Sequence, residues 1–451
     1  MADIRLDSPG DIQDPLRAQL AARYRAVRAL SGHLAAPLSA EDQCLQGMPD
    51  ASPTKWHLAH TTWFFETVVL AALVPGYRPV DERYAYLFNS YYESLGPRQP
   101  RPQRGMLTRP GLAEVQAYRA RIDARLSDFL QDCPEPLWPR AAALVELGLN
   151  HEQQHQELIL TDIKYGLSLN PFDPVYRPAP CPPASAAPPL GWQEFPGGEV
   201  LVGQEEGKDW GDGVGYRLGY EFSYQFSYDN ERPRHPVRLA PYQLATRLTT
   251  CGDYLEFMAD GGYRRPEFWL SDGWAAVCAQ GWQGPLYWRQ EGNQAWSQGW
   301  SHFTLHGRRP VDPAEPVCHL SFYEAAAYAA WAGARLPTEF EWEAAMAGLP
   351  LRGHFLDLER LHPQATKEGV GMQQAYGDVW VWTRSAYDPY PGFRPLPGAL
   401  GEYNGKFMVG QLVLRGGSCV TPLGHVRATY RNYFPPGARW QFSGLRLARD
   451  A

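Results

Sequence analysis

The chain has 451 residues, a length that favours two or more domains over a single core. Its hydrophobic content of 44% and charged content of 20% are typical of a soluble globular protein. A net charge of −7 argues against nucleic-acid binding, which requires a basic face.

No stretch approaches the roughly eighteen apolar residues of a membrane span. The N-terminus lacks the basic and then apolar run of a signal peptide. The seven cysteines are scattered without a Cys-x-x-Cys pair. We therefore expect no membrane partner and a cytoplasmic protein with reduced thiols.

Apolar residues recur at helical spacing in four stretches of the first half, at residues 16–34, 56–73, 112–132 and 141–165. These stretches predict a four-helix bundle. An irregular segment rich in Tyr, Pro, Gly and Arg separates the second and third stretches, at residues 75–110. Long loops in compact domains are usually functional or disordered, and the aromatic content of this one argues against disorder.

Residues 167–190 carry eight prolines and are interpreted as an extended linker. After it come short strand-like pieces, many Gly and Trp residues, and one clear helix at residues 321–333. The prediction is an α+β chain with a helical bundle at 1–166 and a second domain, rich in irregular structure, at 191–451.

His151 and His155 lie four residues apart in the last predicted helix, so their imidazoles share one face and can bind one metal ion. Gln154 lies on the same face. A second pair, His57 and His60, could supply a third imidazole from another helix. Alone, a His-x-x-x-His pair is modest evidence, since such histidines are often exposed or hydrogen-bonded.

Four motifs of the second half resemble the formylglycine-generating-enzyme-like domains, which have a C-type-lectin-like fold. The main one is Arg335-Leu-Pro-Thr-Glu-Phe-Glu-Trp-Glu343, which follows the helix predicted at 321–333. The others, in the expected order, are the stretches at 377–383, 414–418 and 444–449.

Residues 48–60 and 151–157 resemble a DinB-type helical domain. The two types of domain together resemble the sulfoxide synthases of ergothioneine biosynthesis (the EgtB family), over nearly the whole chain. The resemblance implies a mononuclear non-haem Fe(II) enzyme. Such an enzyme uses O2 to join a thiol to C2 of the imidazole of hercynine (Nα-trimethylhistidine), and it leaves a sulfoxide.

The metal ligands implied by the resemblance are His60, His151 and His155. His57 is excluded, because the family's ligand is the histidine of the Ala-His pair after Leu58. Imidazole suits Fe(II), and three histidines leave positions open for a thiolate and O2; on coordination alone, zinc competes. Glu157 points away from the ligand face on a regular helix, so we expect it to support the site or the fold rather than bind the metal.

Residues 88–105 resemble the segment that, in one branch of the family, supplies a tyrosine pair and basic residues for the thiol substrate's carboxylate. A tyrosine beside the reacting oxygen can deliver a proton or an electron, which favours C–S bond formation over thiol oxygenation. Adjacent residues of an extended loop face opposite sides, and we expect Tyr92 rather than Tyr91 to lie nearer the metal. Arg101 and Arg104 are the candidates for the carboxylate, with solvated loop arginines as the alternative.

The stretch Arg431-Asn432-Tyr433-Phe434 resembles the Arg-Asn-aromatic lining of the family's hercynine pocket. The resemblance implies that Asn432 binds the carboxylate of hercynine, and that Tyr433 and Phe434 face its trimethylammonium or the sulfur donor. Gln154 would hydrogen-bond the hercynine imidazole. Another branch has Asp in place of Phe434 and uses γ-glutamylcysteine, so Phe434 favours free cysteine as donor, with γ-glutamylcysteine second.

Two departures from the related patterns qualify the resemblance. Val381 replaces the acid of the common Gly-Asn-Val-Trp-Glu-Trp motif, which affects local geometry more than chemistry. Formylglycine-generating enzymes carry two copper-binding cysteines after Arg-Gly-Gly-Ser, where this chain has Cys419 and then Thr421 and Val426. Formylglycine formation is therefore not expected, and Cys419 is interpreted as a buried small residue.

Three alternative functions remain open on the sequence. An ovothiol-type or a selenoneine-type synthase would use the same iron site with a different acceptor or donor. A non-catalytic small-molecule-binding module would use the same two folds without oxidative chemistry.

Overall fold

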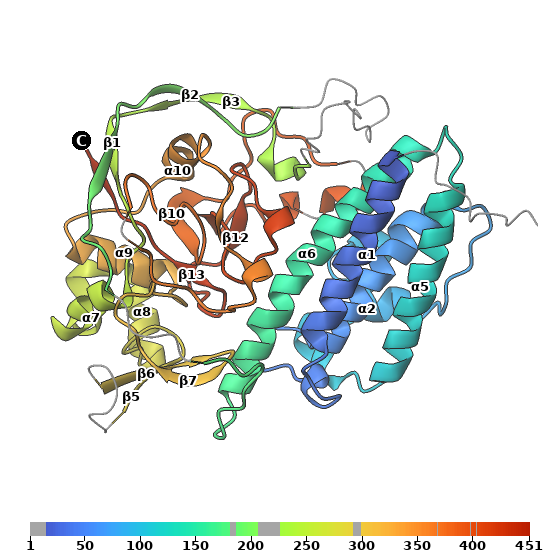
Figure 1. Cartoon of the computed structure of the whole chain (residues 1–451), viewed down its shortest axis with the longest axis horizontal. Helices are drawn as coiled ribbons and strands as arrows, with labels where there is room; N and C mark the ends of the chain where they lie inside the picture. The colour runs from blue at the N-terminus through green and yellow to red at the C-terminus, as the bar shows by residue number, and fades with distance from the viewer. Residues whose placement is uncertain are drawn as a thin grey trace, which may run out of the picture.

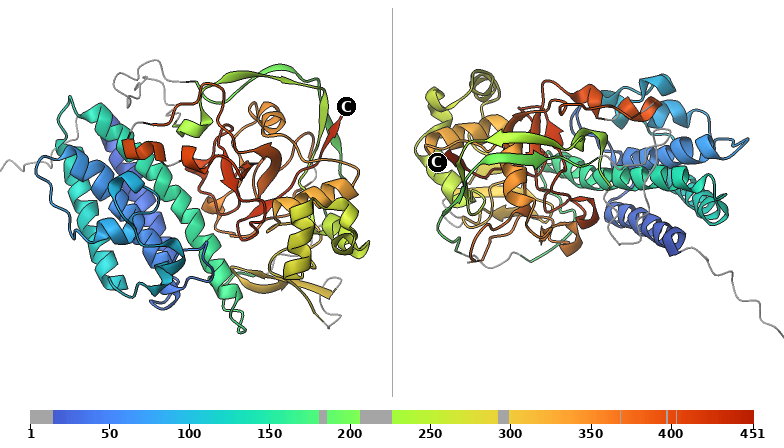
Figure 2. Two further views of the ribbon diagram at one scale, coloured as in Figure 1. Left: turned by 180° about the vertical axis from the view of Figure 1, so that it is seen from behind. Right: turned by 90° about the horizontal axis from the view of Figure 1, so that it is seen from above.

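The computed structural model describes residues 15–180, 186–205, 226–291, 299–367, 369–396, 398–402 and 404–451. Over these residues, a helical half and a mixed half of short strands and helices lie side by side (Figure 1), and two further views agree (Figure 2). The predicted α+β architecture is therefore confirmed. Residues 1–14 and Cys181 lie outside the described residues.

Four long helices form the first half: α1 (Pro15–Ala35), α2 (Thr54–Phe64), α5 (Leu112–Asp132) and α6 (Trp138–Ser168). Helix α2 continues through a π-helical turn (Phe65–Leu70) into α3 (Ala71–Leu73). Apolar side chains of α1, α5, α6 and the π-helical turn that continues α2 pack together in the middle of the bundle, among them Leu20, Tyr24, Phe65, Ile122, Leu126 and Val145. The predicted four-helix bundle is confirmed.

Gly148 sets a close contact between α6 and the π-helical turn. A Cβ atom at this position would lie 2.4 Å from Cε1 of Phe65, so a larger residue would push the two helices apart. His60 lies five residues before Phe65, and His151 lies three residues after Gly148. The contact therefore fixes the spacing of the two helices close to the candidate ligands, and π-helical turns are frequent at such sites.

Helix α6 lies between the other three long helices and the second half (Figure 1). Its 31 residues make it about 46 Å long. The larger apolar cluster joins residues of α2 and α6, such as Trp56 and Ile159, with Trp382 and Leu414 of the second half. The two halves therefore share one hydrophobic core, which holds α6 rigidly against both.

The segment between α3 and α5 contains short helical pieces: α4 (Tyr84–Phe88), η3 (Glu93–Leu95) and η4 (Arg101–Met106). Asn89 fixes its centre, because its Nδ2 donates to the carbonyl of Tyr92 (3.0 Å) and its Oδ1 accepts from the N–H of Tyr92 (3.2 Å). As expected from its aromatic content, the segment is built into the fold.

The described part of the predicted linker forms neither helix nor strand, at residues 169–180 and 186–190. The hydroxyl of Tyr176 donates to the carbonyl of Leu34 (2.6 Å), and the N–H groups of Tyr176 and Arg177 donate to the carbonyl of Leu305 (both 3.1 Å). This segment is thus tied to both halves. The domain boundaries placed at residues 166 and 190 remain predictions.

Short strands form several small sheets in the second half. The central sheet has the order β12 (Asn432–Phe434), β11 (Leu412–Arg415), β10 (Trp380–Ala386), β13 (Ser443–Gly444). A second sheet has the order β1 (Trp192–Phe195), β4 (Tyr242–Ala245), β14 (Ala448–Asp450). A third is β5 (Trp288–Gln290), β6 (Trp300–Thr304), β7 (Gly307–Pro310). The two-stranded sheets are β2 (Gly198–Val202) with β3 (His235–Leu239), and β8 (Gly353–His354) with β9 (Tyr376–Gly377).

The prediction of one clear helix in this half is wrong. Besides α9 (Phe322–Trp331), the structure has α7 (Cys251–Ala259), α8 (Ser271–Gln280) and α10 (Glu339–Met346). These helices are too short for a strong apolar period. Capping boxes nevertheless mark two of them, since Thr250 accepts from the N–H of Asp253 and Thr338 from that of Glu341. Within the described residues, no helix combines the length and apolar character that a bilayer crossing needs.

Candidate metal centre and the surrounding pocket

The three predicted ligands meet at the interface of α2 and α6. His60 comes from α2, His151 and His155 come from α6, and one ring nitrogen of each lies within 4.8 Å of those of the other two. Nε2 of His60 and Nε2 of His151 are 3.1 Å apart. Three imidazoles at right angles around one ion, with bonds of about 2.1 Å, would have nitrogens about 3 Å apart. The triad therefore fits a single metal ion.

The surroundings of His60 expose a lone pair to the centre of the triad. Its Nδ1 donates to the carbonyl of Phe88 at 2.5 Å, so its proton is on Nδ1 and Nε2 is free to coordinate. Burial lowers the pKa of His60, His151 and His155, to about 3 for His151. All three rings are therefore neutral at physiological pH, which is the form that binds metals.

His57 lies beside the triad without belonging to it. Its Nε2 is 3.1 Å from Oδ2 of Asp162, and its Nδ1 is 2.8 Å from Nδ1 of His155. If Nε2 of His57 donates to the carboxylate, its Nδ1 must accept from Nδ1 of His155. Nε2 of His155 is then left with a lone pair. Sequence reasoning excluded His57 as a ligand but missed this orienting contact.

The side of α6 away from the second half is fixed by Glu152. Its carboxylate accepts from Arg28 (2.9 Å), Arg119 (2.5 Å) and Ser31 (2.6 Å), which belong to α1 and α5. Burial alone would raise the pKa of Glu152, but Arg119 and Arg28 lower it to about 2. This buried charge cluster sets the rotation of α6, and hence the direction of its histidines.

Glu157 fixes the side of α6 that faces the second half. Its carboxylate accepts from Nε1 of Trp380 (2.8 Å), Oγ of Ser418 (2.7 Å) and Oγ1 of Thr421 (2.6 Å). Burial raises its pKa, although the three hydrogen bonds oppose that effect. As expected, Glu157 points away from the triad. Thr421, which stands where a copper-binding cysteine was considered, has a structural contact instead.

Gln154 also faces the second half. Its Nε2 donates to the hydroxyl of Tyr430 at 2.6 Å, and that hydroxyl is 3.0 Å from Nε2 of His425. Tyr430 was not among the residues predicted from the sequence. It lies directly before Arg431 in the chain, so this contact brings the predicted Arg-Asn-aromatic stretch to the helix that carries His151 and His155.

The structure places Tyr92, but not Tyr91, in a cavity next to the triad. The cavity is lined by Phe64, Tyr92, Leu147, His151, Tyr228, Leu396, Leu400 and Asn404. The side chain of Tyr92 is 1% exposed, and its hydroxyl has no hydrogen-bond partner in the described part of the chain. Burial raises its pKa, which keeps the hydroxyl protonated. The ring of Tyr91 instead packs edge-on against Phe407, with ring centres 5.2 Å apart.

The two arginines of the same segment differ in position. Arg104 is buried, donates to the hydroxyls of Ser52 (3.0 Å) and Ser90 (3.1 Å), and lies 3.5 Å above the ring of Trp56. Trp56 in turn stacks on His60, with ring centres 4.6 Å apart. Arg101 is exposed and donates to the carbonyl of Asp50. Only Arg104 therefore lies beside the triad.

Arg104 has no ion-pair partner among the residues described. Burial lowers its pKa to about 9, and Arg101 adds to this effect. A buried guanidinium without an acid costs solvation energy, and an anion would compensate for it. The position is therefore suited to bind a carboxylate.

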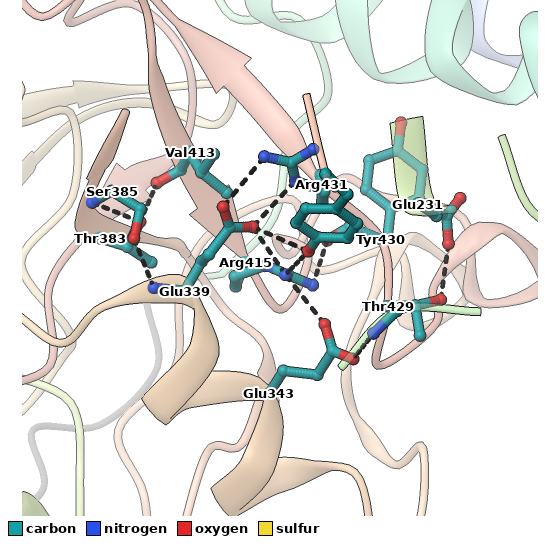
Figure 3. Close-up of polar contacts among 12 residues, drawn as sticks. Glu231, Glu339, Glu343, Thr383, Ser385, Val413, Arg415, Thr429, Tyr430 and Arg431 are labelled. Atoms are coloured by element: carbon teal, nitrogen blue, oxygen red, sulfur yellow. Dashed lines mark hydrogen bonds and ion pairs between the residues drawn. The ribbon is translucent and has the colours of Figure 1, made fainter. Parts of the chain in front are cut away.

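Buried ion pairs hold Arg431, at the start of the predicted Arg-Asn-aromatic stretch (Figure 3). Arg431 donates to both carboxylate oxygens of Glu339 (2.9 and 3.0 Å), and Arg415 contacts Glu339 (2.8 Å) and Glu343 (2.9 Å). The acids belong to the Arg-Leu-Pro-Thr-Glu-x-Glu-Trp-Glu motif. That motif therefore supports the strand that carries Asn432 rather than supplying the site itself.

Strand β12 directs the predicted pocket residues to different places. Tyr433 stacks on Tyr387, with ring centres 4.0 Å apart, and lies 6.0 Å from Phe407. Phe434 packs edge-on against Trp440 at 5.6 Å, as expected for the opposite face of a strand. Oδ1 of Asn432 accepts from the N–H of Tyr433. Tyr433 and Tyr91 therefore lie on the same side of β12, where both contact Phe407. Phe434 lies on the opposite side of the strand.

Cys419 and Val381 are both buried in the second half. Cys419 is fully buried, and burial raises the pKa of its thiol, as expected of a small core residue rather than a reactive one. Val381 is also buried, and it continues the ladder of β10 opposite Arg415 and Gly444. The missing acid of that motif has therefore not interrupted the central sheet.

Arg427, which was not predicted from the sequence, lies at the junction of the halves. It forms an ion pair with Glu231 (2.6 Å), donates to Oδ1 of Asn150 on α6 (3.3 Å), and lies over the rings of Tyr228 and Tyr430. Tyr228 and Asn404 of the cavity were missed as well. They come from separate loops that only the fold brings together.

Comparisons with known proteins agree with the two halves. The profile of the DinB superfamily matches residues 23–159, and that of the sulfatase-modifying factor enzyme 1-like domain matches residues 195–368 and 364–451. A hercynine oxygenase of Mycolicibacterium thermoresistibile is 32% identical over 435 residues, which covers 89% of this chain and 88% of the relative.

Two further relatives define the extent of this similarity. A hercynine oxygenase of Mycobacterium tuberculosis is 32% identical over 437 residues, which covers 90% of this chain and 93% of that protein. A formylglycine-generating enzyme of Streptomyces coelicolor is 28% identical, and the match covers 60% of this chain and 96% of that enzyme. The similarity to the hercynine oxygenases therefore extends over both halves.

Proposed function

This chain belongs to the hercynine oxygenases of ergothioneine biosynthesis, which are non-haem iron oxidoreductases, and from that premise we propose that it joins hercynine to free cysteine with O2. The product would be the sulfoxide of hercynylcysteine. The observation that carries the proposal is the triad: three buried, neutral imidazoles from two helices converge on one point beside a cavity.

The proposed metal is Fe(II), held by His60, His151 and His155. When bound, ferrous iron supplies open coordination positions for a thiolate and O2. The residues of the chain orient the ligands. His57 and the carbonyl of Phe88 fix the tautomers of His155 and His60, and such supporting contacts usually tune affinity about 10- to 100-fold.

We propose that Gln154 and Asn432 bind hercynine. Gln154 reaches the second half from the triad's own helix, so it can orient the hercynine imidazole close to the metal. Asn432 follows Tyr430 and Arg431 and would bind the carboxylate. A trimethylammonium group cannot donate hydrogen bonds, so it needs aromatic faces, for which Tyr433 is favoured over Phe434 by its position.

We propose that Arg104 binds the carboxylate of the thiol substrate, with the exposed Arg101 as the second candidate. The buried position of Arg104 and its lack of an acidic partner within the described residues support this role. Free cysteine is the proposed donor, and γ-glutamylcysteine is the second candidate. Phe434, at the position where another branch has Asp, supports this order.

The proposed catalytic role of Tyr92 is to hold a proton at its hydroxyl. The raised pKa keeps that proton in place until a group in the cavity accepts it. His151 lines the same cavity, so the hydroxyl of Tyr92 can donate its proton to the reacting oxygen. This proton transfer would favour C–S bond formation over formation of the sulfinic acid. Tyr91 is the alternative.

The proposed location is the cytoplasm. The described cysteines are free thiols: Cys44, Cys133, Cys251, Cys278, Cys318 and Cys419. Reduced thiols are typical of that compartment.

The test is a competition assay with the purified, iron-loaded protein. Hercynine with cysteine should consume O2 and give hercynylcysteine sulfoxide, identified by mass spectrometry, with a higher kcat/KM than γ-glutamylcysteine. Preference for histidine or for a seleno-sugar would assign the protein to an ovothiol- or selenoneine-type reaction. If the protein neither binds Fe(II) nor consumes O2, it would be a non-catalytic small-molecule-binding module instead.

A further inference from the structure

A second cluster of metal-binding side chains lies in the other half of the chain. Donor atoms of His302, Glu315 and His362 lie within 4.8 Å of one another, and all three residues are buried. His302 is on β6, Glu315 lies between β7 and α9, and His362 follows η10 (Leu356–Leu358). We propose that these three side chains form a second metal site and that its metal is Zn2+.

The hydrogen bond within the cluster leaves one ring nitrogen of His362 available. Nε2 of His362 lies 3.0 Å from Oε2 of Glu315, but its Nδ1 is buried and has no partner in the described part of the chain. The ring of His302 lies edge-on to that of His362, with centres 4.8 Å apart. A buried polar nitrogen is normally satisfied, so the unpartnered Nδ1 of His362, beside a second imidazole and a carboxylate, indicates a missing cation.

The backbone around these residues is fixed independently of a metal. The carbonyl of Glu315 accepts from the N–H of Cys251 (2.7 Å), and its own N–H donates to the carbonyl of Asp312 (3.3 Å). His302 is held in the ladder opposite Arg309. The donors are therefore preorganised, so a metal would not have to fold the site before it binds.

The donor set selects zinc over the hard cations. Two imidazoles and one carboxylate form a known zinc-binding combination, whereas Mg2+ and Ca2+ prefer oxygen ligands alone. Cys251 and Cys318 line a cavity together with His302 and His362, but burial raises the pKa of both thiols, so neither is counted among the ligands. Lys164 also lines it, but its Nζ is held by Nε2 of His319 (2.7 Å), outside the triad of donors.

The second site is separate from the first. Lys164 lies nine residues, or about 14 Å along α6, from His155. The strands β6 and β7 lie beside the C-terminal end of α6 (Figure 1). A zinc ion there would cross-link three segments that are far apart in the sequence, and we infer that it stabilises the second half rather than taking part in the oxidation.

The experiment counts zinc in full-length protein. The double substitution His60→Ala and His151→Ala first removes the other triad, so that it cannot take up zinc. After removal of metals with a chelator and dialysis against micromolar Zn2+, this background variant should bind one equivalent. Adding His302→Asn and His362→Asn should reduce zinc at least tenfold, whereas adding His33→Asn, at an exposed histidine, should not.

Two outcomes would overturn the second site: a background variant that binds no zinc, or one that keeps its full equivalent without His302 and His362. If the variant with all four substitutions does not fold, binding of Co2+ by the background variant is the deciding measurement. Tetrahedral visible absorption bands support the site, and the absence of bound cobalt rejects it. Iron content of the His302→Asn variant reports the first triad separately, and it should equal that of the wild type.

Discussion

The Nδ1 atoms of His57 and His155 lie 2.8 Å apart, so a histidine outside the candidate metal-binding triad fixes the ring of one inside it. Asp162 completes the arrangement, because its Oδ2 accepts from both His57 and the N–H of Ser52 (2.8 Å). If a metal is bound by the triad, the Asp162 carboxylate would influence it through two imidazole rings, those of His57 and His155.

Asp162→Ala should lower the affinity for Fe(II) about 10- to 100-fold, because His57 loses its acceptor and His155 loses its fixed tautomer. Asp162→Asn should retain most of the affinity, since its amide oxygen can accept both bonds. Metal titration in the absence of O2 measures the effect, with Asp128→Ala, an exposed acid on α5, as control. Equal affinity of Asp162→Ala and wild type would remove His57 from this role.

His151→Ala should lose most of its iron, because two remaining imidazoles form a weak site for Fe(II). Iron per chain after purification is the measurement, and far-ultraviolet circular dichroism checks that the bundle is folded. His33→Ala, an exposed histidine on α1, is the matched control. Near-full iron occupancy in His151→Ala would contradict the ligand assignment.

Tyr92→Phe should keep iron and both substrates but shift the products from the sulfoxide toward cysteine sulfinic acid. The substitution removes only the buried hydroxyl group of Tyr92 and keeps its ring, so packing around the cavity is preserved. The ratio of the two products by mass spectrometry measures the shift. Tyr91→Phe serves as control, and a larger shift in that variant would exchange the two assignments.

Arg104→Gln should raise the KM for cysteine about tenfold or more, because a charge-assisted hydrogen bond to a carboxylate contributes about 1.5–3 kcal/mol. Its effect on the KM for hercynine should be small. Asn432→Ala should give the opposite pattern, and Arg101→Gln should change either constant less than Arg104→Gln does. Equal effects of one variant on both substrates would place that residue outside the proposed contact.

The stability of the protein should rise with pH between about 8 and about 10.4 through Lys164. Burial lowers the pKa of Lys164 to about 8, whereas a lysine in the unfolded chain titrates near 10.4. In this window the unfolded state binds the proton and the folded state does not, so raising the pH favours folding. Lys164→Met should remove this dependence, which amounts to at most about 3 kcal/mol.

Urea unfolding of wild type and Lys164→Met across this pH range, at matched metal content, measures the difference. Lys367→Met changes an exposed lysine and should follow the wild type. Parallel curves for wild type and Lys164→Met would show that Lys164 does not titrate as its burial requires.

The amino-acid sequence by itself determined the elements whose signal is local. The periodicity of the four long helices predicted the bundle, and the spacing of His151 and His155 placed both on one face of α6. The short helices α7, α8 and α10 were missed because eight to ten residues give little periodicity. Their capping boxes, at Thr250 and Thr338, were the local signal that could have revealed two of them.

Only the tertiary structure decided which side chains share the site. Arg101 and Arg104 look alike in the sequence, yet one is exposed and the other lies over Trp56. His57, Arg427 and Tyr430 acquired their contacts from segments 98 to 277 positions away. Such contacts depend on the packing of the two halves around α6, and long-range packing produces no periodic pattern in the amino-acid sequence.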